Sequence, residues 1–271
     1  MAEPVETRSS RSGATLERTA PVAEAARPGL VASSVPIAAP TIALFSDGAS
    51  LEDMLAAYRA GTVQGFTTNP TLMWQAGVTD YVAFARQVAA AIRDLPISFE
   101  VFADDFPGME RQARIIASWG GNVFVKIPVT NTRGESSRDV VRRLSSSGVR
   151  VNVTAMLTID QVREMCGALD REVPSILSLF AGRIADTGRD PEPVMREAVR
   201  IVSRLPLARV CWASPREVLN VYQAQACGCH IVTCTKALLD KLALRDKDLT
   251  EFSRETVEMF FRDAQRAGYT L

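Results

Sequence analysis

The chain has very little lysine. Of its 31 basic residues only four are lysines, so arginine carries almost all of the positive charge. Lys236, Lys241 and Lys247 lie in one polar C-terminal stretch, whereas Lys126 ends a short apolar run at residues 122–128. Lys126 is therefore out of place as a residue that keeps a surface soluble.

Other absences exclude whole classes of protein. The formal net charge is zero and no cluster of basic and aromatic residues occurs, so nothing indicates a nucleic-acid partner. No apolar run reaches the roughly 18 residues that a membrane-spanning helix needs. We therefore expect a soluble protein with no membrane partner.

The five cysteines are an odd number, and no secretory leader is recognisable, which predicts reduced thiols and a cytoplasmic protein. Cys227 and Cys229 are separated by one residue, and His230, the only histidine, follows directly. A zinc site would need CxxC-type spacing and two further ligands, so small buried thiols are the favoured interpretation. No metal is predicted.

Residues 1–40 are rich in Ala, Pro, Ser, Arg and Glu and have no hydrophobic period, which predicts a disordered low-complexity extension. Four arginines are matched there by four glutamates, unlike in an acid-poor transit peptide. Residues 41–271 are expected to form a single domain, because a chain that is 47% hydrophobic can bury a large core.

From residue 41 onward, apolar runs rich in β-branched residues alternate with helical periodicity. Runs that are apolar throughout suit strands buried on both faces of a parallel sheet. Eight such βα units predict an α/β fold, a single (β/α)8 TIM barrel. A doubly wound sheet is the alternative, but no Gly-rich phosphate fingerprint follows the first strand. The expected strands are residues 42–45, 65–67, 97–101, 123–126, 149–153, 175–179, 209–212 and 230–233.

Capping patterns predict where several helices begin. Residues 50–53 resemble a capping box and residues 158–161 form one, while residues 214–217 place Pro215 at a first helical position after Ser214. An extra C-terminal helix is expected at residues 253–267. It could close the barrel or pack on another subunit.

In such a barrel the active site lies at the C-terminal ends of the strands. Any one of the polar residues predicted there could be a turn, cap or core residue, but together around Lys126 they favour a site. They are Asp47, Thr67, Thr68, Asn69, Glu100, Lys126, Asn152, Thr154, Ser178, Arg183, Ser214 and Arg216.

These residue types have a chemistry in common. A lysine among apolar neighbours has its pKa pushed down, and its neutral amine can attack a carbonyl to form a Schiff base, which arginine cannot do. The alternative is a strand-end lysine that extends its head to solvent. Glu100 could move the protons, and Arg183, Arg216 and the helix start at Ser214 could hold a phosphate. The residues favour a phosphorylated carbonyl substrate.

Five motifs resemble the transaldolase family, including its short fructose-6-phosphate aldolase-like members. They are residues 65–71 (GFTTNPT), 124–128 (FVKIP), 152–154 (NVT), 178–183 (SLFAGR) and 213–216 (ASPR). The resemblance runs from about Thr41 to about Ala237 and keeps the motifs in order.

The resemblance implies a class I aldolase mechanism without a metal or other cofactor, sugar-phosphate substrates and a homo-oligomer. It implies that Lys126 forms the Schiff base, that Glu100 is the acid/base working through a water held by Thr154, and that Asp47 takes the C4 hydroxyl proton. The implied contacts to the dihydroxyacetone hydroxyls are Asn69, Asn152 and Ser178. The implied contacts to the phosphate are Arg183, Ser214 and Arg216. Phe180 also belongs to the implied substrate site, at a position where the aldolase branch has tyrosine.

The expected function is therefore transfer of a dihydroxyacetone unit from a ketose phosphate, fructose 6-phosphate or sedoheptulose 7-phosphate, to an aldose phosphate in the pentose phosphate pathway. Alternatives are a fructose-6-phosphate aldolase-like or biosynthetic Schiff-base aldolase, and a catalytically silent sugar-phosphate-binding barrel. The chain departs from the family pattern at Gly48, Leu179, Pro215 and the polar loop at residues 131–137, which concerns the choice of substrate more than the Schiff-base chemistry.

Overall fold

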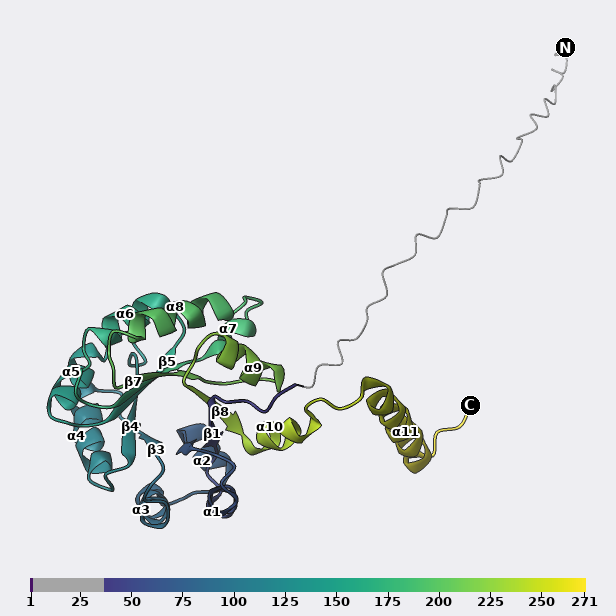
Figure 1. Ribbon diagram of the computed structural model, residues 1–271, viewed down its shortest axis with the longest axis horizontal. Helices are drawn as coiled ribbons and strands as arrows, with labels where there is room; N and C mark the ends of the chain where they lie inside the picture. Colours follow the sequence, from purple (N-terminus) through teal and green to yellow (C-terminus); the bar gives the residue numbers. More distant parts are fainter. Residues whose placement is uncertain (2–36) are drawn as a thin grey trace. The chain divides into compact units, whose positions relative to one another are not determined.

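Eight parallel strands close into a barrel in the computed structural model, which describes Met1 and residues 37–271 (Figure 1). The strands follow one another around the barrel in chain order, and the eighth pairs with the first. The predicted TIM barrel is confirmed. The disordered extension predicted at residues 1–40 lies outside the described residues, apart from Met1 and residues 37–40.

The strands are close to those expected from the apolar runs. They are β1 (Ala43–Asp47), β2 (Gly65–Thr67), β3 (Ile97–Glu100), β4 (Val123–Pro128), β5 (Val151–Met156), β6 (Ser175–Leu179), β7 (Ala208–Trp212) and β8 (Ile231–Thr235). The helices are α1 (Leu51–Ala60), α2 (Pro70–Gln75), α3 (Tyr81–Ala91), α4 (Phe106–Ala117), α5 (Arg138–Ser146), α6 (Ile159–Cys166), α7 (Ala181–Ala185), α8 (Glu192–Val202), α9 (Leu219–Ala226), α10 (Lys236–Lys241) and α11 (Leu249–Ala267), with a 3-10 turn η1 (Leu242–Leu244).

Alternation along the strands separates two cores. Residues such as Val125 belong to the main core, which lies between the sheet and the helices, whereas Phe124 belongs to a small cluster inside the barrel. Because side chains alternate between the faces of a strand, Lys126 shares the inward face of β4 with Phe124. The inner cluster, formed by Phe45, Phe124, Ile176, Cys211 and Ile231, therefore lies one layer below the amine.

Gly65 is required by this inner cluster. A Cβ atom at Gly65 would lie 2.5 Å from the ring of Phe45, which is closer than any real contact. The missing side chain on β2 thus gives the ring of Phe45 its space inside the barrel.

The capping predictions have mixed outcomes. The box at Thr158 is confirmed, because its hydroxyl and the side chain of Gln161 cap one another's backbone N–H groups. Ser50 accepts a hydrogen bond from the backbone of Asp53 at 3.2 Å.

The helix start predicted at Ser214 is wrong. Ser214 has a left-handed backbone, φ 59°, and α9 begins only at Leu219. The carbonyl of Ser214 lies so close to Gly182 that a Cβ there would be 1.6 Å from it. The side chain of Asn220 then accepts hydrogen bonds from the N–H groups of Arg216 (2.7 Å) and Glu217 (3.2 Å), so the segment forms a turn.

The extra C-terminal helix is confirmed and begins earlier than predicted, at Leu249. Asp248 caps it by accepting from the N–H of Glu251 at 2.8 Å, and Gly268 ends it with φ 68°. None of its residues is buried, so α11 contributes nothing to closing the barrel. In the described part of the chain, no helix combines the length and the apolar character that crossing a membrane would require.

Candidate active site

Lys126 lies at the end of β4, only 6% exposed, facing the interior of the barrel. Its amine donates a hydrogen bond to the backbone carbonyl of Thr68 at 2.9 Å and lies 3.2 Å from Oε2 of Glu100. The register of the sheet pairs Glu100 directly with Lys126. Tyr81 donates to the backbone carbonyl of Glu100 at 2.7 Å and so holds the end of β3 in place.

The pair is an arrangement that can move protons. Counting side-chain atoms alone, Lys126 is 7% exposed and Glu100 is 14% exposed, so both charged groups are largely buried. A carboxylate within hydrogen-bond reach of an amine can accept its proton and return it to a reacting group. The site therefore has the two groups that imine formation needs.

Asp47, at the end of β1, is held in a chain of hydroxyl groups. Thr67 donates to Asp47 Oδ1 at 2.7 Å, and Thr233 lies 2.6 Å from the Thr67 oxygen. Since Thr67 gives its only hydroxyl hydrogen to Asp47, Thr233 donates to Thr67. Burial raises the pKa of Asp47, and the nearby charge of Lys126 and the hydrogen bond from Thr67 oppose that rise.

A second polar chain crosses the barrel beneath the cavity. Ser178 donates to the amide oxygen of Asn152 at 2.8 Å, and the Asn152 amide nitrogen donates to Ser98 at 3.0 Å. All three side chains are buried. The two bonds define which end of the Asn152 amide faces Ser178.

The hydroxyl group of Thr154 can still donate and accept hydrogen bonds. Its Oγ1 atom is buried and has no hydrogen-bond partner among the described residues. The pairing of β5 with β6 is irregular just beyond it, where Ala155 has φ 61°. A buried hydroxyl that faces a polar cavity and lacks a protein partner suits a bound water.

Two arginines lie on the rim. Arg183 comes from α7 and packs its guanidinium over the ring of Phe180, 5.8 Å from the ring centre. Arg216 comes from the turn before α9, and its Nε atom lies 3.2 Å from Asp186, whose carboxylate also contacts Nη2. Two cations on one rim favour an anionic substrate group.

These groups line one cavity of about 490 Å³. Of the eleven residues proposed for catalysis and substrate binding, Asn152 alone does not line it, since it is fully buried below Ser178. Asn69 lines the cavity and also caps α2, its Oδ1 accepting from the N–H of Leu72 at 3.0 Å. Its amide nitrogen is the part left for a ligand.

Sequence reasoning missed several residues of this site. Ser98 and Thr233 are small hydroxyl residues inside strands, and Tyr81 and Asp186 lie on helices or their ends. The period of two in β3 could have indicated Ser98, because it lies two residues before Glu100. Nothing in the sequence indicated Asp186.

The cysteine and histidine cluster is separate from this site. Cys227 and Cys229 are buried, and the Nδ1 atom of His230 accepts from the backbone of Val210 at 3.0 Å. Within residues 37–271, no group of three or more His, Cys, Asp or Glu side chains is placed to hold a metal ion.

Fold and site together define a (β/α)8 barrel that encloses a buried lysine and carboxylate pair at its C-terminal mouth. The family model described as Transaldolase/Fructose-6-phosphate aldolase matches residues 44–271. The chain belongs to this family. The match extends beyond the stretch of resemblance seen in the sequence and includes α11.

Curated relatives agree with this membership. A probable transaldolase of Dehalococcoides mccartyi is 33% identical over 213 residues, covering 77% of this chain and 95% of the relative. One of Roseiflexus castenholzii is 36% identical over 203 residues, covering 73% and 88%. One of Methanococcus maripaludis is 32% identical over 214 residues, covering 77% and 94%.

Proposed function

We propose that the protein is a transaldolase that carries a dihydroxyacetone unit from a ketose phosphate to an aldose phosphate through a Schiff base on Lys126. The observation that carries the proposal is the 3.2 Å approach of the Lys126 amine to Glu100, buried in a cavity whose rim holds two arginines. Pentose phosphate metabolism in the cytoplasm is the setting that this chemistry suggests.

In the proposed reaction the neutral amine of Lys126 attacks the C2 carbonyl of the ketose. Glu100 moves protons through a water at Thr154, so that the carbinolamine loses its hydroxyl group as water and an imine forms. Asp47 then takes the C4 hydroxyl proton, the C3–C4 bond breaks, and the aldose product leaves. The electron pair of that bond forms a C2–C3 double bond, which leaves an enamine of three carbons attached to Lys126.

The second half reverses these steps with a new aldose. The enamine carbon attacks the aldehyde, Asp47 returns the proton to the new hydroxyl, and water hydrolyses the imine. Burial raises the pKa of Asp47, which suits a carboxylate that must both take and return a proton. Ser178 and Asn69 are proposed to hold the hydroxyl groups of the dihydroxyacetone unit, with Asn152 orienting Ser178 from below.

Arg183 and Arg216 are proposed to bind the phosphate, with Ser214 beside them. Ser214 would act through its own hydroxyl or backbone, since no helix begins there. The alternative within the family, release of free dihydroxyacetone, is disfavoured by Phe180, which has no hydroxyl to deliver a proton to the enamine. A silent sugar-phosphate-binding barrel would have no need of a buried lysine beside a carboxylate.

A homo-oligomer is also proposed, with α11 as its contact. The helix buries none of its own residues, yet exposes Leu249, Phe252, Val257, Phe260 and Phe261. So many exposed large apolar side chains on one helix are typical of a surface that packs on another protein.

One coupled assay separates the activities. Aldehyde production from fructose 6-phosphate is measured with and without erythrose 4-phosphate, and a transaldolase needs that acceptor for sustained turnover. Equal rates without acceptor would favour the aldolase, and no turnover of any ketose phosphate would favour a silent barrel.

A further inference from the structure

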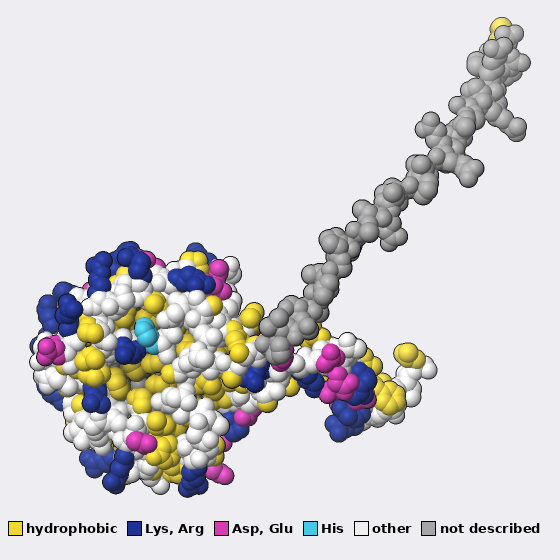
Figure 2. Space-filling view, in the orientation of Figure 1, with side chains coloured by type: hydrophobic (Ala, Val, Ile, Leu, Met, Phe, Trp, Pro, Cys, Tyr) yellow, Lys and Arg dark blue, Asp and Glu magenta, His cyan; other side chains and the backbone are white. Residues whose placement is uncertain are grey.

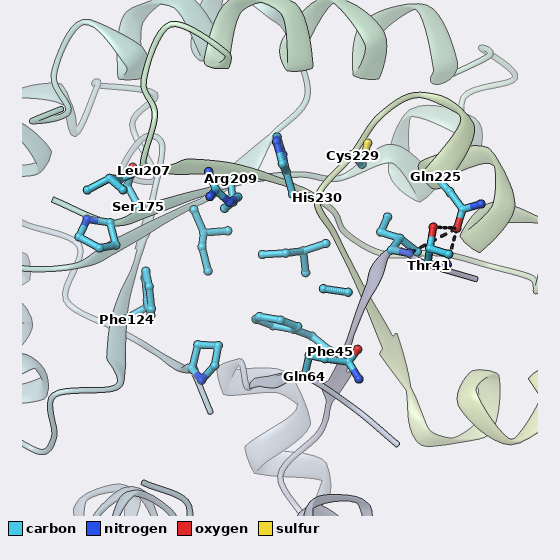
Figure 3. A pocket seen from close by; sticks show the side chains of 16 residues that line it. Thr41, Phe45, Gln64, Phe124, Ser175, Leu207, Arg209, Gln225, Cys229 and His230 are labelled. Atoms are coloured by element: carbon cyan, nitrogen blue, oxygen red, sulfur yellow. Dashed lines mark hydrogen bonds between the residues drawn. The ribbon is translucent and has the colours of Figure 1, made fainter. Parts of the chain in front are cut away.

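A second and larger cavity lies at the opposite end of the barrel, where the strands begin (Figure 3). Its volume is about 750 Å³, against about 490 Å³ for the active-site cavity. Small-molecule sites are typically about 300–1,000 Å³ in volume. None of the proposed catalytic residues lines this second cavity.

The floor of this cavity is apolar. It is formed by Phe45, Phe124, Ile176 and Ile231, which all belong to the cluster inside the barrel. Figure 2 shows the hollow as a patch of hydrophobic side chains, with the single histidine of the chain and a basic side chain on its edge. An apolar body of a ligand could rest on this floor.

Of the residues that line the cavity, Arg209 and His230 are basic and none is acidic, and just outside the lining the guanidinium of Arg150 lies 6.0 Å from the centre of the Phe124 ring. Arg209 lies two residues before Cys211 on β7 and therefore shares its inward face, and His230 immediately precedes β8. The two segments are joined by the backbone, because His230 N donates to the carbonyl of Val210 at 3.0 Å. The basic groups therefore lie on neighbouring strands at one side of the rim.

The polar side chains of the rim have donors to spare. Nδ1 of His230 accepts a hydrogen bond from the N–H of Val210, so Nε2 carries the proton of the neutral ring. Among the described residues, Nε2 makes no hydrogen bond. Arg209 uses Nη1 to donate to two backbone carbonyls, each at 2.9 Å, while its Nε and Nη2 make no hydrogen bond within residues 37–271.

Two glutamines of the rim also have side-chain donors that are not used. The side-chain oxygen of Gln64 accepts from the N–H of Leu44 at 2.9 Å, and that of Gln225 accepts from the N–H of Thr41 at 2.6 Å. Their amide nitrogens make no hydrogen bond within the part of the chain that the structure describes. A rim on which Arg209, His230 and the two glutamines have spare donors is suited to an anion.

We propose that this cavity binds a small organic anion with an apolar body, such as an aromatic carboxylate or sulfonate. The charged head would lie beside Arg209 and His230, and the body would cover Phe124 and Ile176. This site is independent of the chemistry at Lys126 and does not rest on the proposed transaldolase activity.

The test uses two fluorescent probes of the same shape on the full chain. 8-Anilinonaphthalene-1-sulfonate carries the anionic head, and N-phenyl-1-naphthylamine has the same rings without it. We expect saturable binding of the sulfonate, at least ten-fold weaker binding in Arg209→Glu, and binding of the neutral probe unchanged within two-fold. Arg171→Glu, an exposed arginine outside the cavity lining, is the matched control and should not change either probe.

A second variant addresses the floor and guards against misfolding. Ala43→Leu fills part of the cavity with a larger side chain and removes no contact, so it should weaken the binding of both probes, while an unchanged melting temperature reports that the barrel is intact. Fructose 6-phosphate should not displace either probe.

Three results would overturn the proposal. One is the absence of saturable binding. The second is sulfonate binding that Arg209→Glu or Ala43→Leu leaves unchanged, which would mean that the probe does not use this rim and floor, for example because it binds the exposed phenylalanines of α11. The third is binding that disappears as the protein concentration rises, since a second copy of the chain would then cover the cavity.

Discussion

The guanidinium of Arg216 and the carboxylate of Asp186 meet side on. Nε of Arg216 lies 3.2 Å from one carboxylate oxygen, and Nη2 contacts the other. Nη1 makes no hydrogen bond to any residue that the structure describes, and Arg216 lines the active-site cavity. Because Asp186 directly follows α7, which carries Arg183, one short helix provides one arginine and orients the other.

Replacing either arginine by alanine should weaken phosphorylated substrates selectively. A hydrogen bond to a charged group contributes about 1.5–3 kcal/mol, so kcat/KM for fructose 6-phosphate should fall about 10- to 150-fold in Arg183→Ala and Arg216→Ala. Reactions of dihydroxyacetone and glyceraldehyde should change little. Equal losses for both kinds of substrate would mean that the arginines stabilise the fold and do not read the phosphate.

Asp186→Ala should have a smaller effect of the same kind. Both partners are about half exposed, with 50% exposure for Arg216 and 52% for Asp186, and exposed pairs contribute at most about 1 kcal/mol. KM for fructose 6-phosphate should therefore rise by up to about five-fold with kcat unchanged, and Asp186→Glu should restore part of the loss. A lower KM in Asp186→Ala would show that the carboxylate competes with the phosphate.

Thr67→Val should shift the pH dependence of turnover. The hydroxyl of Thr67 stabilises the ionised form of Asp47, so its removal raises the pKa of Asp47 further above the ordinary range. Since the proposed role needs ionised Asp47, the acidic limb of the kcat profile should move to higher pH. A hydrogen bond worth about 1 kcal/mol corresponds to a shift of somewhat less than one unit.

Thr68→Val is the control for this shift. Thr68 is the neighbouring buried threonine, and its hydroxyl donates to the backbone carbonyl of Ser98 at 3.2 Å. Its substitution should leave the acidic limb in place. A profile that moves equally in both variants would argue against Asp47 as the group that titrates.

Phe180→Tyr should increase the release of free dihydroxyacetone. The ring of Phe180 has no hydroxyl that could protonate the proposed enamine, so transfer to erythrose 4-phosphate should exceed release at least ten-fold, a barrier difference of about 1.4 kcal/mol. The added hydroxyl should narrow that ratio. Wild-type cleavage that is equally fast without an acceptor would contradict the transaldolase assignment.

The barrel could be predicted because its signal is local. Apolar runs such as that of β4 are buried on both faces, so strand positions follow from composition to within a few residues. The largest shift is in β5, which was expected at residues 149–153 but spans Val151–Met156, where the irregular backbone at Ala155 continues the strand.

Site residues could be predicted from the sequence only where they carry an unexpected charge or belong to a recognisable motif. Lys126 and Glu100 were recognised and do lie together, whereas Ser98 resembles any small strand residue until its bond to Asn152 is known. The turn at Ser214 depends on the distant Gly182, so a local capping pattern could not predict it. Asp186 likewise contacts Arg216 only because α7 packs against the turn at Ser214.

The most direct test of the central claim is trapping of the imine at Lys126. Borohydride added with fructose 6-phosphate should inactivate the enzyme irreversibly and add the mass of the reduced adduct to the peptide that contains Lys126. Lys126→Arg keeps the charge but lacks the nucleophile, so it should be inactive and unlabelled. Labelling at Lys236, Lys241 or Lys247 with Lys126 unmodified, or full turnover by Lys126→Arg, would contradict the Schiff-base account.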